Sequence, residues 1–209
     1  MALDQKRLQK KKAKRTAKAK ARKQAAGHIR ENVSAGLLTA ASATVYECWW
    51  PESAESWEKG LAQVVVSRRR GNGMIVAAVF LVDLHCLGAK NVFIRDFSER
   101  EFGEMLDHIR RQSPLERVDP ACARKLVEGS VDYARNLGLA PHKDYALAAH
   151  IFGDIDPAAC SRDFVFGLDG KPFYVSGPED SPGFIRRVLR TLERHCGPDG
   201  FHYLTTPGF

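Results

Sequence analysis

Residues 61–84 read LAQVVVSRRRGNGMIVAAVFLVDL, and this stretch decides the fold. Two largely apolar runs, Leu61–Arg69 and Met74–Leu84, flank the segment Arg70-Gly71-Asn72-Gly73. Asn-Gly beside a further glycine supplies the positive φ angles that a tight hairpin requires. The second run is apolar at consecutive positions, which predicts a central strand that is covered on both faces. The stretch therefore predicts a β-hairpin at the centre of a sheet.

The segments on either side of this hairpin add further strands and helices. Ser98 and Glu101 form a capping box that starts one helix, and Asp119-Pro120 starts another that stops at Gly138. Strands followed by helices and further strands predict an α+β fold, with a mostly antiparallel sheet built from two hairpins and three or four packing helices. The other predicted elements are strands over Val45–Trp50, Asn91–Arg95 and Phe201–Leu204, helices over 53–59, 143–151 and from Ser181-Pro182 to Gly197-Pro198, and a second hairpin that joins Phe164–Gly167 to Pro172–Ser176 through Asp169-Gly170.

The charge of the chain is distributed unevenly. Of its 32 Lys and Arg and 25 Asp and Glu, eleven basic side chains and one acid fall within residues 1–27. The rest of the chain carries 21 basic and 24 acidic side chains, so the net charge of +7 comes from the N-terminal stretch. Like charges without an apolar stripe predict a disordered or fraying segment. We therefore divide the chain into a basic flexible arm over 1–27, a linker over 28–44 and one α+β domain over 45–209.

The basic arm is typical of a segment that binds a polyanion. It has no aromatic side chains to stack on bases, so its contacts would go to phosphates and tolerate any base sequence. We expect RNA or a ribonucleoprotein such as the ribosome as the partner, bound with a steep salt dependence; a solubility tail is the alternative. The predicted contact residues are Lys6, Arg7, Lys10, Lys11, Lys12, Lys14, Arg15, Lys18, Lys20, Arg22 and Lys23.

The last predicted helix carries a second basic feature. Arg186, Arg190 and Arg194 follow one another at intervals of four residues, which places them on one side of a helix. Such a row would bind phosphates, or it is the ordinary solvated face of an amphipathic helix. Arg68–Arg70, at the tip of the central hairpin, would extend the basic surface, but alternation along the strand would point one of the three away from it.

A second hypothesis belongs to a different class, a metal-dependent hydrolase or nuclease. Asp83 and His85 stand two residues apart at the end of the central strand, where a buried carboxylate needs a partner. With His142 and Asp144 they would hold a divalent metal ion for phosphodiester hydrolysis. The alternative is that Asp83 accepts hydrogen bonds from loop amides and that the other two residues cap the helix after Pro141. On the binding hypothesis the protein is non-catalytic and uses no cofactor.

The segment Gly167–Pro178 is rich in glycine, proline and aromatic residues, and two interpretations of it stay open. It presents a ligand-binding hairpin, or its composition reflects turn chemistry and core packing. The residues presented on the first interpretation are Lys171, Tyr174 and Gly177-Pro178, and those buried on the second are Phe164, Phe166, Phe173 and Val175.

The remaining signals concern location and relatives. No apolar run is long enough to cross a membrane and no export signal is seen, so we expect a cytoplasmic protein whose five cysteines are reduced.

Three segments, FLVDLHCLG (80–88), APHKDY (140–145) and GLDGKPFYVSGP (167–178), resemble an uncharacterised family of bacterial proteins. The resemblance covers Val45 to Leu204 and implies no activity or site residues.

Overall fold

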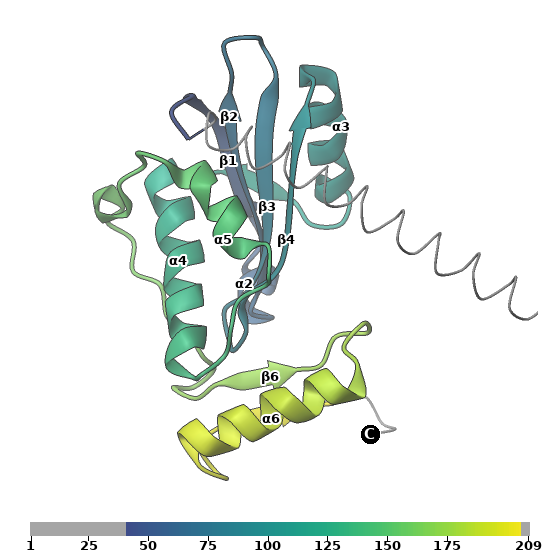
Figure 1. Cartoon of the computed structure of the whole chain (residues 1–209), viewed down its shortest axis with the longest axis vertical. Coiled ribbons are helices and arrows are strands. Elements are labelled where there is room, and N and C mark those ends of the chain that lie inside the picture. Colours follow the sequence, from purple (N-terminus) through teal and green to yellow (C-terminus); the bar gives the residue numbers. More distant parts are fainter. Residues whose placement is uncertain (1–40, 206–209) are drawn as a thin grey trace, which may run out of the picture.

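A computed structural model describes residues 41–205, which form an α+β fold as predicted (Figure 1). Its main sheet is antiparallel and has the strand order β4-β3-β2-β1-β5. These strands are β1 (Thr44–Pro51), β2 (Leu61–Arg69), β3 (Ile75–Asp83), β4 (Gly88–Phe97) and β5 (Leu115–Arg117), and a separate pair consists of β6 (Phe173–Val175) and β7 (His202–Leu204). The helices are α2 (Ala54–Glu58), α3 (Glu99–Arg110), α4 (Pro120–Asn136), α5 (Tyr145–Ala148) and α6 (Pro182–Cys196), with 3-10 turns η1 (Ala149–Phe152) and η2 (Pro157–Ala159).

The central hairpin is confirmed. Strands β2 and β3 pair without interruption from Leu61 opposite Asp83 to Arg69 opposite Ile75. The turn closes where the Gly73 amide donates to the Arg70 carbonyl at 2.9 Å, and Gly73 has a φ of 82°. A side chain at that φ would be strained, which explains the glycine.

Strand β3 is covered on both faces, as its apolar run predicted. Val76, Ala78 and Phe80 belong to a core beneath α4 and α5, whereas Ile75 and Ala77 belong to a second core beneath α3. Figure 1 shows α4 and α5 on one side of the sheet and α3 on the other. The alternation follows from the strand's period of two residues.

The C-terminal part of the described chain forms a β6-α6-β7 unit. The two strands are parallel, so a crossover must connect them, and α6 provides it. The predicted limits of α6 are confirmed: Ser181 Oγ accepts a hydrogen bond from the Phe184 amide at 3.2 Å, and Gly197 ends the helix at a φ of 77°. Its buried residues Ile185, Val188 and Leu192 pack with Tyr174 of β6.

The predicted second hairpin is wrong in its pairing. Asp169 and Gly170 do make the turn, with φ of 51° and 77°, but the only bridge across it joins Leu168 to Lys171. Phe173–Val175 pairs with β7 instead, which lies far along the chain. The reason is packing, because Phe164 contacts Trp50 with ring centroids 6.0 Å apart, and Phe166 stacks on Tyr133 at 5.8 Å.

Other predicted boundaries differ in detail. Strand β4 extends beyond Asn91–Arg95 at both ends, and the short strand β5 at the edge of the sheet was not predicted. The expectation of five reduced cysteines is wrong for one pair, since Cys122 of α4 and Cys160 form a disulfide. Within residues 41–205, no helix combines the length and the apolar character needed to span a membrane.

Arg68 is buried, so it does not extend a basic surface. Its side chain is only 1% exposed, and its guanidinium donates to the main-chain carbonyls of Ala43, Ile151 and Phe152. It thereby fastens the end of the predicted linker and η1 to β2. The other two arginines of the hairpin tip are paired with acids, because Arg69 lies 3.1 Å from a Glu99 carboxylate oxygen and Arg70 lies 3.0 Å from Asp96.

Candidate functional site

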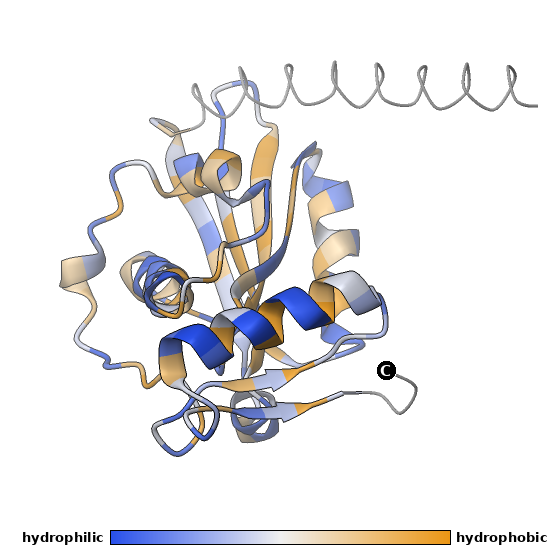
Figure 2. Ribbon diagram, turned by 60° about the horizontal axis from the view of Figure 1, so that its bottom comes forward, coloured by the Kyte–Doolittle hydropathy of each residue, from blue (hydrophilic) through white to orange (hydrophobic). Residues whose placement is uncertain are grey.

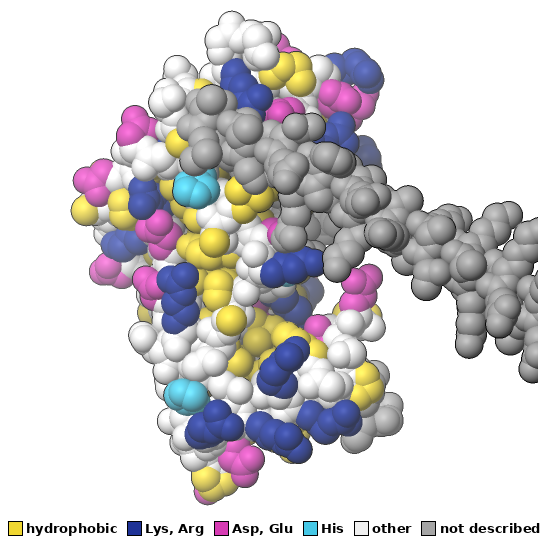
Figure 3. All heavy atoms as spheres, viewed as in Figure 1, with side chains coloured by type: hydrophobic (Ala, Val, Ile, Leu, Met, Phe, Trp, Pro, Cys, Tyr) yellow, Lys and Arg dark blue, Asp and Glu magenta, His cyan; other side chains and the backbone are white. Residues whose placement is uncertain are grey.

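The outer face of α6 is the most basic helical surface of the described chain. Arg186, Arg187, Arg190 and Arg194 are all exposed, and Glu193 is the helix's one acid. Figure 2 shows the polar side of α6 turned outward, and Figure 3 shows Lys and Arg side chains gathered where this helix lies. With a rise of about 1.5 Å per residue, Arg186 to Arg194 spans about 12 Å along the helix.

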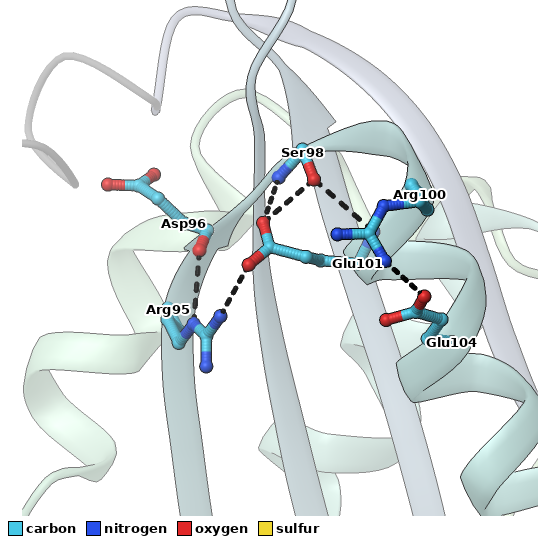
Figure 4. Close-up of polar contacts among 6 residues, drawn as sticks. All are labelled: Arg95, Asp96, Ser98, Arg100, Glu101 and Glu104. Carbon is cyan, nitrogen blue, oxygen red and sulfur yellow. Dashed lines mark hydrogen bonds and ion pairs between the residues drawn. The ribbon is translucent and has the colours of Figure 1, made fainter.

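These arginines differ from others on the surface in their pairing. Arg186, Arg190 and Arg194 form no ion pair with any residue in the range 41–205. By contrast, Figure 4 shows Arg95 bound to Glu101 and Arg100 bound to Glu104, at 3.2 and 2.5 Å. We call the three unpaired side chains the arginine row. Their guanidinium groups keep their hydrogen-bonding capacity for an external anion.

The arm that carries the other predicted contacts, Lys6 to Lys23, lies outside the described residues, as does most of the linker. Its dense positive charge is the property by which it would contribute to the site. The arginine row and the arm would act additively on a polyanion, because both neutralise phosphates and neither reads bases.

Asp83 accepts hydrogen bonds from turn amides, which was one of the two interpretations left open by the sequence. Its Oδ1 accepts from the His85 amide at 3.0 Å and from the Cys86 amide at 2.9 Å. These bonds fold the chain from β3 into β4. Burial raises the pKa of Asp83 above its ordinary value, and the positive charge of Lys90 and the turn amides oppose this shift.

The four residues of the metal hypothesis do not assemble into a metal site. His142 Nδ1 lies 3.8 Å from Asp144 Oδ2 and accepts a hydrogen bond from the Asp144 amide. Neither residue lines the cavity that Asp83 and His85 border. Asp144 precedes α5 without a side-chain capping bond. In the part of the chain that the structure describes, no group of three or more His, Cys, Asp and Glu side chains could hold a metal ion.

Asp83 and His85 instead line a largely apolar cavity of about 540 Å³. Its walls come from α2, the ends of β2, β3 and β4, and the β6-β7 pair. The Gly177-Pro178 loop also borders it, whereas Lys171 and Tyr174, the other residues of the ligand-binding interpretation, do not line it. The other lining residues are Glu58, Lys59, Leu61, Leu81, Lys90, Leu168, Phe173, Val175, Ser176 and Leu204.

The side chains of β6 alternate in the opposite sense to the prediction. Tyr174 is fully buried beneath α6, and its hydroxyl donates to Asp180 at 3.0 Å. Phe173 and Val175 therefore face the cavity, and Val175 is 40% exposed. The sequence contained no signal for this cavity, because its walls come from strands that are distant along the chain.

The replacement Asp83→Asn should leave the fold intact, because the asparagine side chain would keep an oxygen that accepts both turn amides. We expect the free energy of unfolding to change by less than about 1 kcal/mol, whereas Asp83→Ala should lower it by about 2 kcal/mol, since both amides lose their acceptor. Urea unfolding measures both.

The pH dependence of the same variant tests the burial of the charge. Because the folded-state pKa is raised, folded protein holds this proton more tightly than the unfolded chain does. The stability of the wild type relative to Asp83→Asn should therefore be greatest below the ordinary pKa of aspartate and fall as the pH rises. A difference that grows with pH would show that Asp83 has a stabilising cationic partner in the folded state.

Comparison of the chain with family models, with curated proteins and with solved structures finds no match. The resemblance of three segments to a bacterial family thus stays a prediction.

Proposed function

We propose that this protein is a non-catalytic nucleic-acid-binding factor that binds RNA or a ribonucleoprotein such as the ribosome. The observation that carries the proposal is the arginine row of α6, whose three guanidinium groups are exposed and without ion pairs among residues 41–205. The eleven basic side chains of the arm support it from the sequence.

Binding would proceed by electrostatic capture of the phosphate backbone. The arm attracts the polyanion through its dense positive charge, which acts over about a Debye length. The arginine row then orients the body of the protein, because a guanidinium makes two parallel hydrogen bonds to a phosphate. Neither contact reads base edges, so the expected binding tolerates different sequences.

A cytoplasmic location belongs to the same proposal, since RNA and ribosomes are found there. The Cys122–Cys160 disulfide counts against it, because structural disulfides are rare in the cytosol.

The arginine row is tested by the triple variant Arg186→Gln, Arg190→Gln, Arg194→Gln in the full-length chain. We expect it to bind a labelled single-stranded RNA about tenfold more weakly at low salt. The slope of log affinity against log salt should become shallower by about 2, since each lost phosphate contact on a single strand contributes about 0.7. Fluorescence anisotropy at several salt concentrations measures both quantities.

The matched control removes the same amount of charge from paired arginines. Arg95, Arg100 and Arg135 are more than half exposed and bind Glu101, Glu104 and Asp132. Their replacement by Gln should change RNA affinity less than threefold. Equal losses in the two triple variants would show that net charge alone governs binding, and the arginine row would have no specific role.

A further inference from the structure

The cavity beside Asp83 gathers exposed apolar side chains. Leu61 is 43% exposed, Val175 40% and Leu204 61%, and all three line it. They belong to β2, β6 and β7, so the fold brings them together from three distant segments. A volume of about 540 Å³ lies within the range of pockets that bind small molecules, which are mostly apolar with a few polar groups. Leaving such side chains open to water is unfavourable unless a ligand covers them.

The polar groups of the cavity offer mainly hydrogen-bond donors. Lys90 is largely buried, with an 18% exposed side chain. Its ammonium contacts the Val175 carbonyl at 3.5 Å and forms a long ion pair with Asp180 at 3.8 Å, and the structure shows no shorter polar contact of this group with any residue in the range 41–205. The ring nitrogens of His85 have no hydrogen-bond partner among residues 41–205.

The two acids that line the cavity, Asp83 and Glu58, differ in their surroundings. Asp83 accepts two turn amides through Oδ1, and Glu58 is exposed on the short helix α2. Lys59, beside Glu58, is paired with Glu55 at 2.5 Å. Asp180, the ion-pair partner of Lys90, already accepts hydrogen bonds from the Tyr174 hydroxyl and the Gly177 amide. The capacity left to Lys90 and His85 is therefore for a further acceptor, and a carboxylate could bind Lys90 at a shorter distance than the 3.8 Å that separates it from Asp180.

We propose that this cavity binds a small amphipathic carboxylate. The apolar body of the ligand packs against Leu61, Val175 and Leu204, and its carboxylate accepts hydrogen bonds from Lys90 and His85. This activity is independent of RNA binding, because the cavity and the arginine row lie on opposite faces of the β6-β7 pair: Phe173 and Val175 face the cavity, whereas Tyr174 faces α6.

The test is calorimetric titration of the full-length protein with octanoate and with 1-octanol, its uncharged analogue. We expect saturable binding of octanoate at one site, with a dissociation constant below about 1 mM, and about tenfold weaker binding of 1-octanol. Lys90→Gln should weaken octanoate binding about tenfold and change 1-octanol binding less than twofold, because it removes only the charge.

A second variant examines the apolar wall. Leu61→Glu places an acid there, so octanoate should bind at least tenfold more weakly, by repulsion and loss of apolar contact. Phe93→Glu is the matched control, because Phe93 is a strand residue that is 49% exposed and does not line the cavity. The proposal is overturned if octanoate shows no saturable binding, or if its affinity is the same in Lys90→Gln, Leu61→Glu and Phe93→Glu. Should Leu61→Glu fail to fold, Lys90→Gln decides alone.

Discussion

The replacement Arg68→Met should lower the free energy of unfolding by about 3–5 kcal/mol, because it leaves three carbonyls without their donor. The guanidinium donates from Nε to the Ile151 carbonyl at 2.7 Å, from Nη2 to Phe152 at 2.7 Å and from Nη1 to Ala43 at 2.5 Å. Methionine fills much of the same volume, so the loss reports hydrogen bonding more than packing. Urea unfolding followed by circular dichroism measures it.

The control for this prediction is Asp154→Asn. Arg68 Nη2 also lies 2.8 Å from Asp154 Oδ1, but the Asp154 side chain is 85% exposed. Solvent screens such a pair, so its loss should lower the stability far less than Arg68→Met does. If Arg68→Met were as stable as the wild type, the attachment of residues 41–43 and η1 to β2 would need another explanation.

The central hairpin was predictable because its information is local. Asn72-Gly73 and the two apolar runs determine turn, pairing and burial within 24 residues, and they agree with one another. The capping box at Ser98 and the limits of α6 were predictable for the same reason.

Features that depend on distant segments were not predictable. Strand alternation predicted that one of Arg68–Arg70 would point away from the basic surface, but the partners of each side chain come from distant segments. Arg68 is buried against η1, whereas Arg69 is paired with Glu99. Likewise Asp169-Gly170 gave a correct turn but a wrong hairpin, since the partner of β6 is β7. Packing decides which strands pair when they are far apart in the sequence. Here Tyr174 of β6 packs against α6, the helix that connects β6 to β7.

The candidate site likewise has one part that the sequence predicted and one part that only the structure shows. The spacing of Arg186, Arg190 and Arg194 predicted a common helix face, but whether acids from other elements would neutralise it needed the structure. Asp83 and His85 were predicted to share one side of a strand, but β3 ends at Asp83 and His85 lies in the turn that follows. Both line an apolar cavity, and they form no metal site with other residues in the range 41–205.

Deletion of residues 1–26 should produce the largest functional effect. It removes eleven of the protein's 32 basic side chains and leaves the described fold, residues 41–205, complete. We expect RNA affinity at low salt to fall by about a hundredfold or more, because most of the neutralised phosphates are lost. Filter binding of labelled RNA measures it, and Asp83→Asn serves as a control that should bind like the wild type.

The salt dependence of RNA affinity is the most direct test of whether RNA binds by counterion release at the arm and the arginine row. The measurement titrates one RNA with three proteins: the full-length chain, the 1–26 deletion and the arginine-row variant. The salt concentration should run from about 50 to about 200 mM, because a protein with six to ten phosphate contacts on duplex DNA loses about 10³–10⁵ in affinity over that range. We predict a steep loss for the full-length chain, a much shallower one for the deletion and an intermediate one for the arginine-row variant. Equal slopes for all three proteins, or no binding by the full-length chain at the lowest salt, would contradict the claim.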